Sequence, residues 1–296
     1  MTSIRKLIRG QARDIGFPIR RLLPDAEVRR IGPFVFFDHM GPAVFEAGTQ
    51  AGDVRPHPHI GLATVTYLFS GAMMHRDSLG NVQRIVPGDI NWMTAGRGIV
   101  HSERMPEDIR EQQIAVQGLQ MWVALPERDE EIAPNFQHYA AEQLPRAMFP
   151  GVQLHVLAGQ AFGQNSPVVC HSPTLYVAAW LEAGASLEIS SETANYPERG
   201  LYVVSGSVTV NEQVVDAGTL IVLEERNSVS VTANVSAVLM LLGGAALESS
   251  PRLWWNFVSS SKERIEAAKL AWASQDKNVF PPVPGESERI PLPDRQ

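Results

Sequence analysis

The sequence predicts an all-β protein of the sandwich or barrel type, built from two similar halves. Three observations lead to this expectation. Short runs of β-branched and aromatic residues follow one another along most of the chain, turn residues separate them at short intervals, and helical periodicity is almost absent. The 296 residues suffice for two domains of ordinary size. Hydrophobic residues make up 44% of the chain, which is enough to fill a core.

Composition narrows the classes of function. The formal net charge of −7 argues against nucleic-acid binding by the surface as a whole. No run of eighteen apolar residues is present, so we expect neither a membrane span nor a membrane partner. The single cysteine, Cys170, excludes an intramolecular disulfide and indicates a reducing compartment. We therefore expect a cytoplasmic protein in which this thiol is buried and inert.

The first thirty residues form the one basic region of the chain. A transit peptide is one interpretation, because such peptides are rich in arginine and poor in acidic residues. However, Asp14, Asp25 and Glu27 interrupt the region, and no apolar stretch follows it. We therefore favour a folded first strand with a solvated basic edge, where charges discourage pairing with other sheets.

The first half shows a series of predicted strands separated by tight turns. An aromatic run begins at Phe34 and ends at Gly41-Pro42, which indicates a buried strand. Asp77-Ser78-Leu79-Gly80-Asn81 has the composition of a turn that joins the two arms of a hairpin. We place His75 in this hairpin and expect it to be exposed. The strands expected in this half cover residues 34–40, 60–69, 73–76, 82–86, 90–94, 99–103 and 112–125.

The second half repeats parts of the first. Residues 66–71 and 201–206 both end a predicted strand with Ser-Gly, and a predicted hairpin, a glycine-containing turn and another strand follow in each. Near the end, residues 259–274 have helical character, with Ser259 or Ser260 as the expected N-cap, and the Pro-rich chain from Val279 on is expected to be extended. The strands expected in this half cover residues 154–157, 174–181, 186–189, 200–210, 213–215, 219–223 and 237–242.

Two short motifs of the first half have the spacing of metal ligands. His57 and His59 are separated by one residue, and so are His101 and Glu103. In a β-strand, residues i and i+2 point to the same face, so two such strands facing one pocket would direct three imidazoles and one carboxylate at a common point. That set suits a divalent transition metal and leaves room for a further ligand. The matching positions of the second half lack both motifs, so we expect a single metal site.

An alternative interpretation is that these side chains are barrel residues satisfied by hydrogen bonds. Burying three imidazoles and a carboxylate without a cation would be costly, because each polar group then needs its own partner. The metal site is therefore the favoured interpretation. The remaining histidines lack such neighbours, except that His39 follows a buried strand and could orient a ligand. Phe36, Phe37, Met93, Met121 and Trp122 are candidates for the cavity lining, although core packing is the better explanation for any single one of them.

Four motifs in the first half of the chain resemble those of a known family. Residues 37–42 (Phe-Asp-His-Met-Gly-Pro), 56–61 (Pro-His-Pro-His-Ile-Gly), 95–103 (Ala-Gly-Arg-Gly-Ile-Val-His-Ser-Glu) and 118–126 (Gly-Leu-Gln-Met-Trp-Val-Ala-Leu-Pro) together resemble the pirin family of the cupin superfamily. The resemblance extends over residues 1–135 and, more loosely, over residues 200–223. General cupins carry a glutamate at the position of Ala63 or Thr64. Here Glu103 supplies the acid, as is typical of pirins.

The resemblance implies a bicupin, that is, two stacked antiparallel barrels of the jelly-roll type with a short C-terminal helix. We expect residues 1–132 to form the barrel with the metal site. Residues 133–296 would then form a second barrel without ligands, followed by the helix and an extended tail. The family's ligands map onto His57, His59, His101 and Glu103. The implied metal is Fe(II), with manganese, cobalt, nickel, copper and zinc as open alternatives.

Two functions follow from the resemblance, and they belong to different classes. Bacterial members resemble quercetinases, which open the ring of flavonols with dioxygen and release carbon monoxide. For such an enzyme we expect a planar phenolic substrate, with Glu103 as the catalytic group that accepts a proton from it. The alternative is a non-enzymatic protein that senses metal or redox state and binds a transcription regulator or another protein partner. In either case we expect a monomer without direct nucleic-acid contact.

Overall fold

The structure is a computed structural model and describes residues 4–190, 196–225 and 227–293. Within these ranges nearly all regular structure is antiparallel β-sheet, which confirms the expected all-β fold. The described residues contain two α-helices, the short α1 (Glu107–Glu111) and the C-terminal α2 (Lys262–Ala273), together with the 3₁₀ turns η1 (Glu127–Asp129) and η2 (Ala141–Gln143). None of the described helices is both long and apolar enough to cross a membrane.

The chain forms two compact units, which do not follow the boundary expected at residue 132. The ligand-bearing unit comprises Arg13–Ile19, Asp38–Ala141 and Glu248–Gln296. The companion unit comprises Met1–Ala12, Arg20–Phe37 and Glu142–Leu247. Strand pairing explains part of this division, because the first strand adds to a sheet of the companion unit. The central boundary lies between residues 141 and 142.

The ligand-bearing unit contains two antiparallel sheets and most of the strands expected in the first half. Its C-terminal part adds the ribbon of β25 (Arg252–Trp254) and β26 (Phe257–Ser259). One sheet has the order β12 (Asn135–Tyr139), β9 (Ile90–Thr94), β6 (Leu62–Ser70), β11 (Val116–Ala124), β4 (Phe34–Ala43), β3 (Pro18–Leu23) and β2 (Gln11–Asp14). Residues 11–12, 20–23 and 34–37 of its last three strands are counted with the companion unit. The other sheet has the order β5 (Val54–His59), β10 (Ile99–Arg104), β7 (Met73–Asp77) and β8 (Val82–Ile85).

The companion unit repeats this arrangement of one seven-stranded and one four-stranded sheet. The larger sheet has the order β1 (Ile4–Arg9), β22 (Thr219–Leu223), β19 (Glu198–Ser205), β24 (Ala237–Gly244), β17 (Thr174–Leu181), β14 (Val152–Ala158) and β13 (Arg146–Phe149). The smaller has the order β18 (Ser186–Ile189), β23 (Val229–Ala233), β20 (Ser207–Val210) and β21 (Gln213–Asp216), and a short ribbon joins β15 (Gln160–Ala161) and β16 (Gln164–Asn165). The basic first strand is therefore folded.

Glycines at matching turns show that the two halves repeat each other in conformation as well as in sequence. Gly71 has a φ of 77° and Gly206 a φ of 80°, each directly after the Ser that ends a strand. This left-handed region favours glycine because it has no Cβ, and in both places a Cβ would lie within 3.0 Å of a neighbouring atom. The interior of the companion unit, however, is filled by a continuous apolar cluster from both of its sheets.

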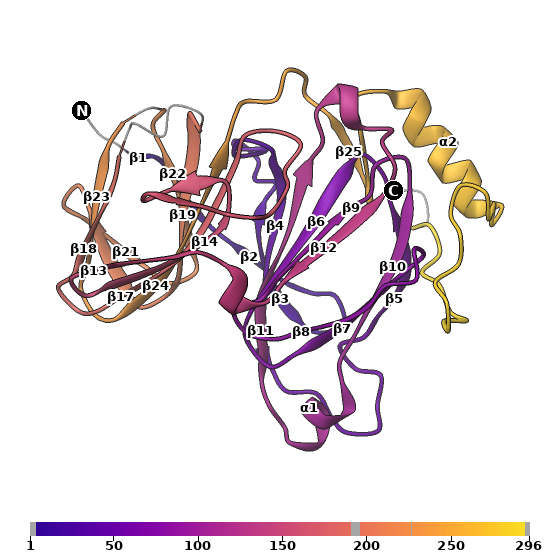
Figure 1. The fold of residues 1–296 in the computed structure, drawn as a ribbon, viewed down its shortest axis with the longest axis horizontal. Helices are drawn as coiled ribbons and strands as arrows, with labels where there is room; N and C mark the ends of the chain where they lie inside the picture. Colours follow the sequence, from indigo (N-terminus) through magenta and orange to yellow (C-terminus); the bar gives the residue numbers. More distant parts are fainter. Residues whose placement is uncertain (1–3, 191–195, 226, 294–296) are drawn as a thin grey trace. The chain divides into compact units, whose positions relative to one another are not determined.

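The C-terminal segment, residues 248–293, covers one side of the ligand-bearing unit. Figure 1 shows α2 and the chain after it running alongside β10 and β5. Phe257, Ile265, Trp272 and Phe280 from this segment form one apolar cluster with Val100 of β10 and with Ile60, which directly follows β5. The helix is capped by Ser261, whose Oγ accepts a hydrogen bond from the backbone N–H of Arg264, so the expected caps at Ser259 and Ser260 were wrong by one or two residues.

Candidate metal centre

The two predicted ligand motifs lie on adjacent antiparallel strands. β5 carries His57 and His59, and β10 carries His101 and Glu103. His101 pairs directly with His57 across the two strands, so both imidazoles stand on the same face of the sheet. The pairing of β10 with β5 is irregular between His101 and Glu103, whereas the pairing of β10 with β7 continues without a break.

Three imidazoles meet at one point inside this unit. The ring centroids of His57 and His101 are 4.3 Å apart, and that of His59 lies 5.0 Å from the first and 5.1 Å from the second. Each ring places a nitrogen within 4.8 Å of the other two. All three are buried, and burial is the main cause that lowers their pKa values, to about 4 for His57 and well below 6.5 for the others. The rings are therefore neutral at pH 7 and able to act as ligands.

Hydrogen bonds to the backbone fix two of the three rings. His57 Nδ1 lies 2.9 Å from the carbonyl oxygen of Arg55, and His59 Nδ1 lies 3.1 Å from that of Asn256. A neutral ring that donates through Nδ1 keeps its lone pair on Nε2. Both rings thus offer Nε2 to the centre of the cluster, in the way that carbonyl partners orient histidine ligands.

The cluster fits a cation better than it fits an apolar core. His59 Nε2 and His101 Nε2 face each other at 3.1 Å, so at most one proton can lie between them. His101 Nδ1 is also buried and has no hydrogen-bond partner among the described residues. Leaving buried nitrogens in this state is costly, whereas three converging imidazole lone pairs are a common ligand set for divalent transition metals.

Glu103 lies beside the cluster without joining it. Its carboxylate is not among the groups within 4.8 Å of one another in the described part of the chain. It is buried, and its Oε1 is 3.5 Å from the hydroxyl of Thr66 on the facing strand β6. Burial raises its pKa to about 7, with the Thr66 hydroxyl acting weakly in the opposite direction. A carboxyl in this state can take up or release a proton near neutral pH.

The wall opposite the histidines combines an aromatic ring with polar groups. The indole of Trp122 on β11 lies edge-on to the imidazole of His59, with their centroids 5.2 Å apart. Gln120 precedes Trp122 by two residues on β11, and its Oε1 accepts a hydrogen bond from the hydroxyl of Thr66 on β6 over 2.8 Å. Among the residues proposed to line the cavity, Trp122 contacts the candidate ligand His59, whereas Phe36 lies under the guanidinium of Arg21.

His39 was proposed to orient a ligand. Its Nε2 lies 2.9 Å from the amide nitrogen of Gln117.

His75 was expected to be exposed, and that expectation was wrong. It is 5% exposed and pairs with Glu103 across β7 and β10, so its ring stands on the face that carries the cluster. The ring stacks on Phe136 with the centroids 4.4 Å apart, and its Nε2–H donates a hydrogen bond to Asp77 Oδ2 over 3.1 Å. Burial alone would raise the pKa of Asp77, but hydrogen bonds from His75 and Asn81 outweigh it and lower that pKa. The His-x-Asp spacing, which repeats the spacing of the ligand pairs, could have indicated an inward-facing pair.

Comparisons with known proteins agree with this geometry. Residues 16–123 match the family model described as pirin, and residues 176–278 match the pirin C-terminal cupin domain. A pirin-like protein of Caulobacter vibrioides is 44% identical to this chain over 95% of the chain and 96% of that protein. The chain belongs to the pirin family. Human pirin is 32% identical over 94% of the chain and 93% of that protein.

Solved structures of relatives extend the family assignment to the fold. The crystal structure of quercetin 2,3-dioxygenase from Acinetobacter baumannii superposes with a TM-score of 0.89 at 33% identity, covering 98% of this chain and 95% of that chain. The bicupin expected from the pirin motifs is therefore confirmed, including the short C-terminal helix. The three histidines that the resemblance implies as ligands lie close together in the structure.

The buried imidazoles of this pirin predict a loss of stability on acidification when metal is absent. The unfolded chain takes up a proton on His57 near pH 6.5, whereas the folded protein does so only near pH 4, so stability is lost as the pH falls through this window. Glu103 has the opposite effect on stability, because its pKa is higher in the folded protein, at about 7, than in the unfolded chain. The measurement is the free energy of unfolding by denaturant in the presence of chelator. Between pH 7 and 4.5 it should fall by about 2 kcal/mol less in His57→Gln than in the wild-type protein. An equal loss of unfolding free energy in the two proteins would contradict the burial of His57 in its neutral form.

Proposed function

We propose that this protein is a metal-dependent dioxygenase that opens the heterocyclic ring of quercetin-type flavonols with dioxygen and releases carbon monoxide. The observation that carries the proposal is the group of three buried, neutral imidazoles beside a buried carboxyl and an indole ring. The relative from Acinetobacter baumannii, whose structure is named quercetin 2,3-dioxygenase, supports the same substrate class. The proposal includes a cytoplasmic location and a monomeric state.

The proposed metal ligands are His57, His59, His101 and Glu103, and Fe(II) is the favoured ion. A bound divalent ion would act as a Lewis acid that lowers the pKa of a phenolic hydroxyl. The three imidazoles are suited to hold it because two of them are already oriented by the carbonyls of Arg55 and Asn256. The carboxylate of Glu103 is the fourth candidate, brought to the same face of β10 as His101.

Glu103 is the proposed general base. In the metal-free protein burial raises its pKa to about 7, so a carboxylate released from the metal could accept a proton near neutral pH. The Thr66 hydroxyl, which bonds Gln120, lies close enough to Glu103 to hold the carboxyl in place. Trp122 offers a flat apolar surface beside His59 against which a planar phenol can lie, and it excludes water from the reacting atoms.

Quercetin turnover tests the proposal. Protein loaded with Fe(II) is expected to consume dioxygen and release carbon monoxide in equal amounts as quercetin disappears, and chelator-treated protein is not. Reloading the treated protein with manganese, cobalt, nickel, copper or zinc identifies the ion that supports the reaction. Metal bound at one equivalent without turnover of quercetin or of related phenols would overturn the proposal. That result would support a metal-dependent regulatory protein instead.

A further inference from the structure

The outer face of β10 is held by a polar contact from the C-terminal segment. His101 and Glu103 point to the cluster, and Ser102, which lies between them, points to the opposite side. Ser102 is fully buried, and its Oγ donates to Glu286 Oε1 over 2.8 Å. The guanidinium of Arg104 donates to both oxygens of the same carboxylate. Glu286 therefore holds two consecutive outward-facing residues of the strand that carries two candidate ligands.

The contact of Glu286 is buried, and Arg104 has two further carboxylate partners, Asp53 at 3.5 Å and Glu288 at 2.9 Å. The side chain of Glu286 is 9% exposed, so its hydrogen bonds are protected from water. Glu288 also binds Arg104, at 2.9 Å, but it is 39% exposed, and in the described part of the structure it makes no hydrogen bond to Ser102. The two glutamates thus differ in burial and in contact with the ligand strand, although both lie on the same stretch of chain. An exposed pair of this kind contributes little to stability.

The same segment also holds the other ligand strand. The backbone N–H of Ile290 donates to the carbonyl of Pro56, the residue before His57, over 2.8 Å. Trp272 Nε1 donates to the carbonyl of Ile290, and the guanidinium of Arg289 lies 4.8 Å above the indole of Trp272. Together with the carbonyl of Asn256 on His59, these contacts connect residues 256–290 to both strands of the cluster.

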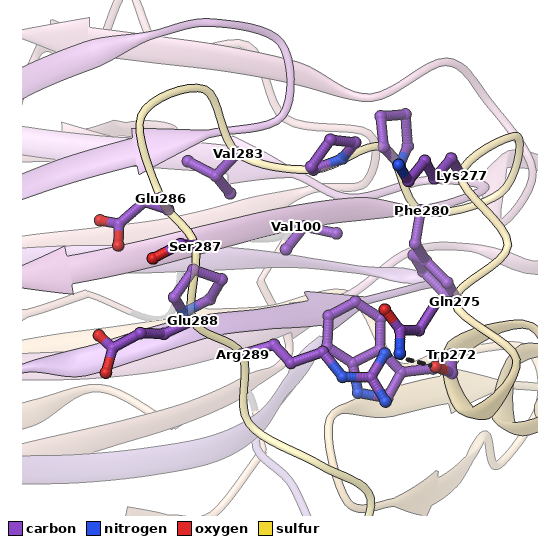
Figure 2. Close-up of a pocket in the computed structure, with 13 residues that line it drawn as sticks. Val100, Trp272, Gln275, Lys277, Phe280, Val283, Glu286, Ser287, Glu288 and Arg289 are labelled. Carbon is purple, nitrogen blue, oxygen red and sulfur yellow. Dashed lines mark hydrogen bonds between the residues drawn. The ribbon is translucent and has the colours of Figure 1, made fainter.

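A pocket lies between this stretch of chain and the ligand strands. This cavity has a volume of about 140 Å³ and is lined by Val100, Phe280 and Val283 among others. Figure 2 shows Glu286 and Glu288 on one side of this cavity, and Trp272 and Arg289 on the other. Polar contacts therefore lie at both sides of this pocket, and they hold the segment against the strands together with the apolar cluster.

We propose that Glu286 is a positioning residue for the metal centre, which acts from outside the barrel by holding Ser102 and Arg104 and thereby fixing the strand of His101 and Glu103. This role rests on the proposed metal centre. Outer partners that orient metal ligands contribute roughly 10- to 100-fold in affinity. Since coupling between two sites is reciprocal, a bound metal should in turn fix the C-terminal segment.

Metal affinity of the full-length protein tests this role. Titration of chelator-treated protein with Co(II) against a chromophoric chelator should show binding weakened about tenfold by Glu286→Ala. The visible spectrum of the bound Co(II) should change as well, because the ligand geometry is altered. Glu288→Ala is the matched control, since it removes the exposed partner of the same arginine, and it should keep the wild-type affinity and spectrum.

Hydrogen exchange gives a second readout that does not depend on activity. Metal should slow exchange of the Ile290 amide in wild type and in Glu288→Ala, and much less in Glu286→Ala. If Glu286→Ala does not fold, Ser102→Ala makes the same comparison by removing only the hydroxyl. Wild-type affinity and spectrum in the folded variants would overturn the role of Glu286 alone. Failure of the wild-type protein to bind metal would overturn the proposed metal centre and this role with it.

Discussion

Replacing His101 by alanine is expected to abolish metal binding under conditions in which the wild-type protein is fully loaded. His101 is 1% exposed, and its Nε2 faces that of His59 at 3.1 Å, so it lies at the centre of the cluster. Loss of one of three imidazole ligands should weaken binding on the order of a thousandfold, or about 4 kcal/mol. Elemental analysis after dialysis and a competitive metal titration measure the effect, and quercetin turnover should be lost with the metal.

His155→Ala provides the control for this experiment. His155 is also a buried histidine, but it lies in the companion unit and packs against Trp180. Its removal should leave the metal content at the wild-type level even if it lowers the stability of that unit. Wild-type affinity in His101→Ala would mean that the three imidazoles do not form the binding site.

Replacing Glu103 by glutamine is expected to reduce quercetin turnover by roughly 100- to 10,000-fold while much of the metal is retained. Glutamine preserves the volume of the side chain and its contact with the Thr66 hydroxyl, but it cannot take up a proton. The three histidines remain to hold the ion. The measurement is kcat with Fe(II)-loaded protein, normalised to the metal content of each preparation.

Glu107→Gln is a suitable control, because this glutamate is exposed on the short helix α1. Its turnover should equal that of the wild-type protein. If Glu103→Gln also turned over at the wild-type rate, the carboxylate would have no part in the chemistry. If the variant lost its metal altogether, Glu103 would act chiefly as a ligand, and the loss of turnover would not identify it as the base.

The sequence predicted the parts of the site that follow from strand periodicity. His57, His59 and His101 could be placed together because i and i+2 side chains share a face, and the hairpin between Met73 and Ile85 followed from its turn residues. His75 was misplaced because a hairpin was taken to be a surface feature. Its burial depends on the pairing of β7 with β10, which a single sequence does not reveal.

Other features of the site leave no sequence signal. His59 is oriented by the main-chain carbonyl of Asn256, which any residue could supply. The contact of Glu286 with Ser102 joins residues 184 positions apart. We expected the C-terminal segment to belong to the second barrel because it follows that barrel in the chain. The sequence does not show which strands this segment packs against.

The apolar interior of the companion unit bears on attempts to give this chain a second metal centre. That unit holds only two of the eight histidines, and its two sheets meet through closely packed side chains such as Leu154, Val177 and Val231. Grafting three imidazoles there would exchange aliphatic contacts for groups that need both a cation and hydrogen-bond partners. A designer would therefore have to replace large apolar side chains of this unit by smaller ones before a metal site could be built there.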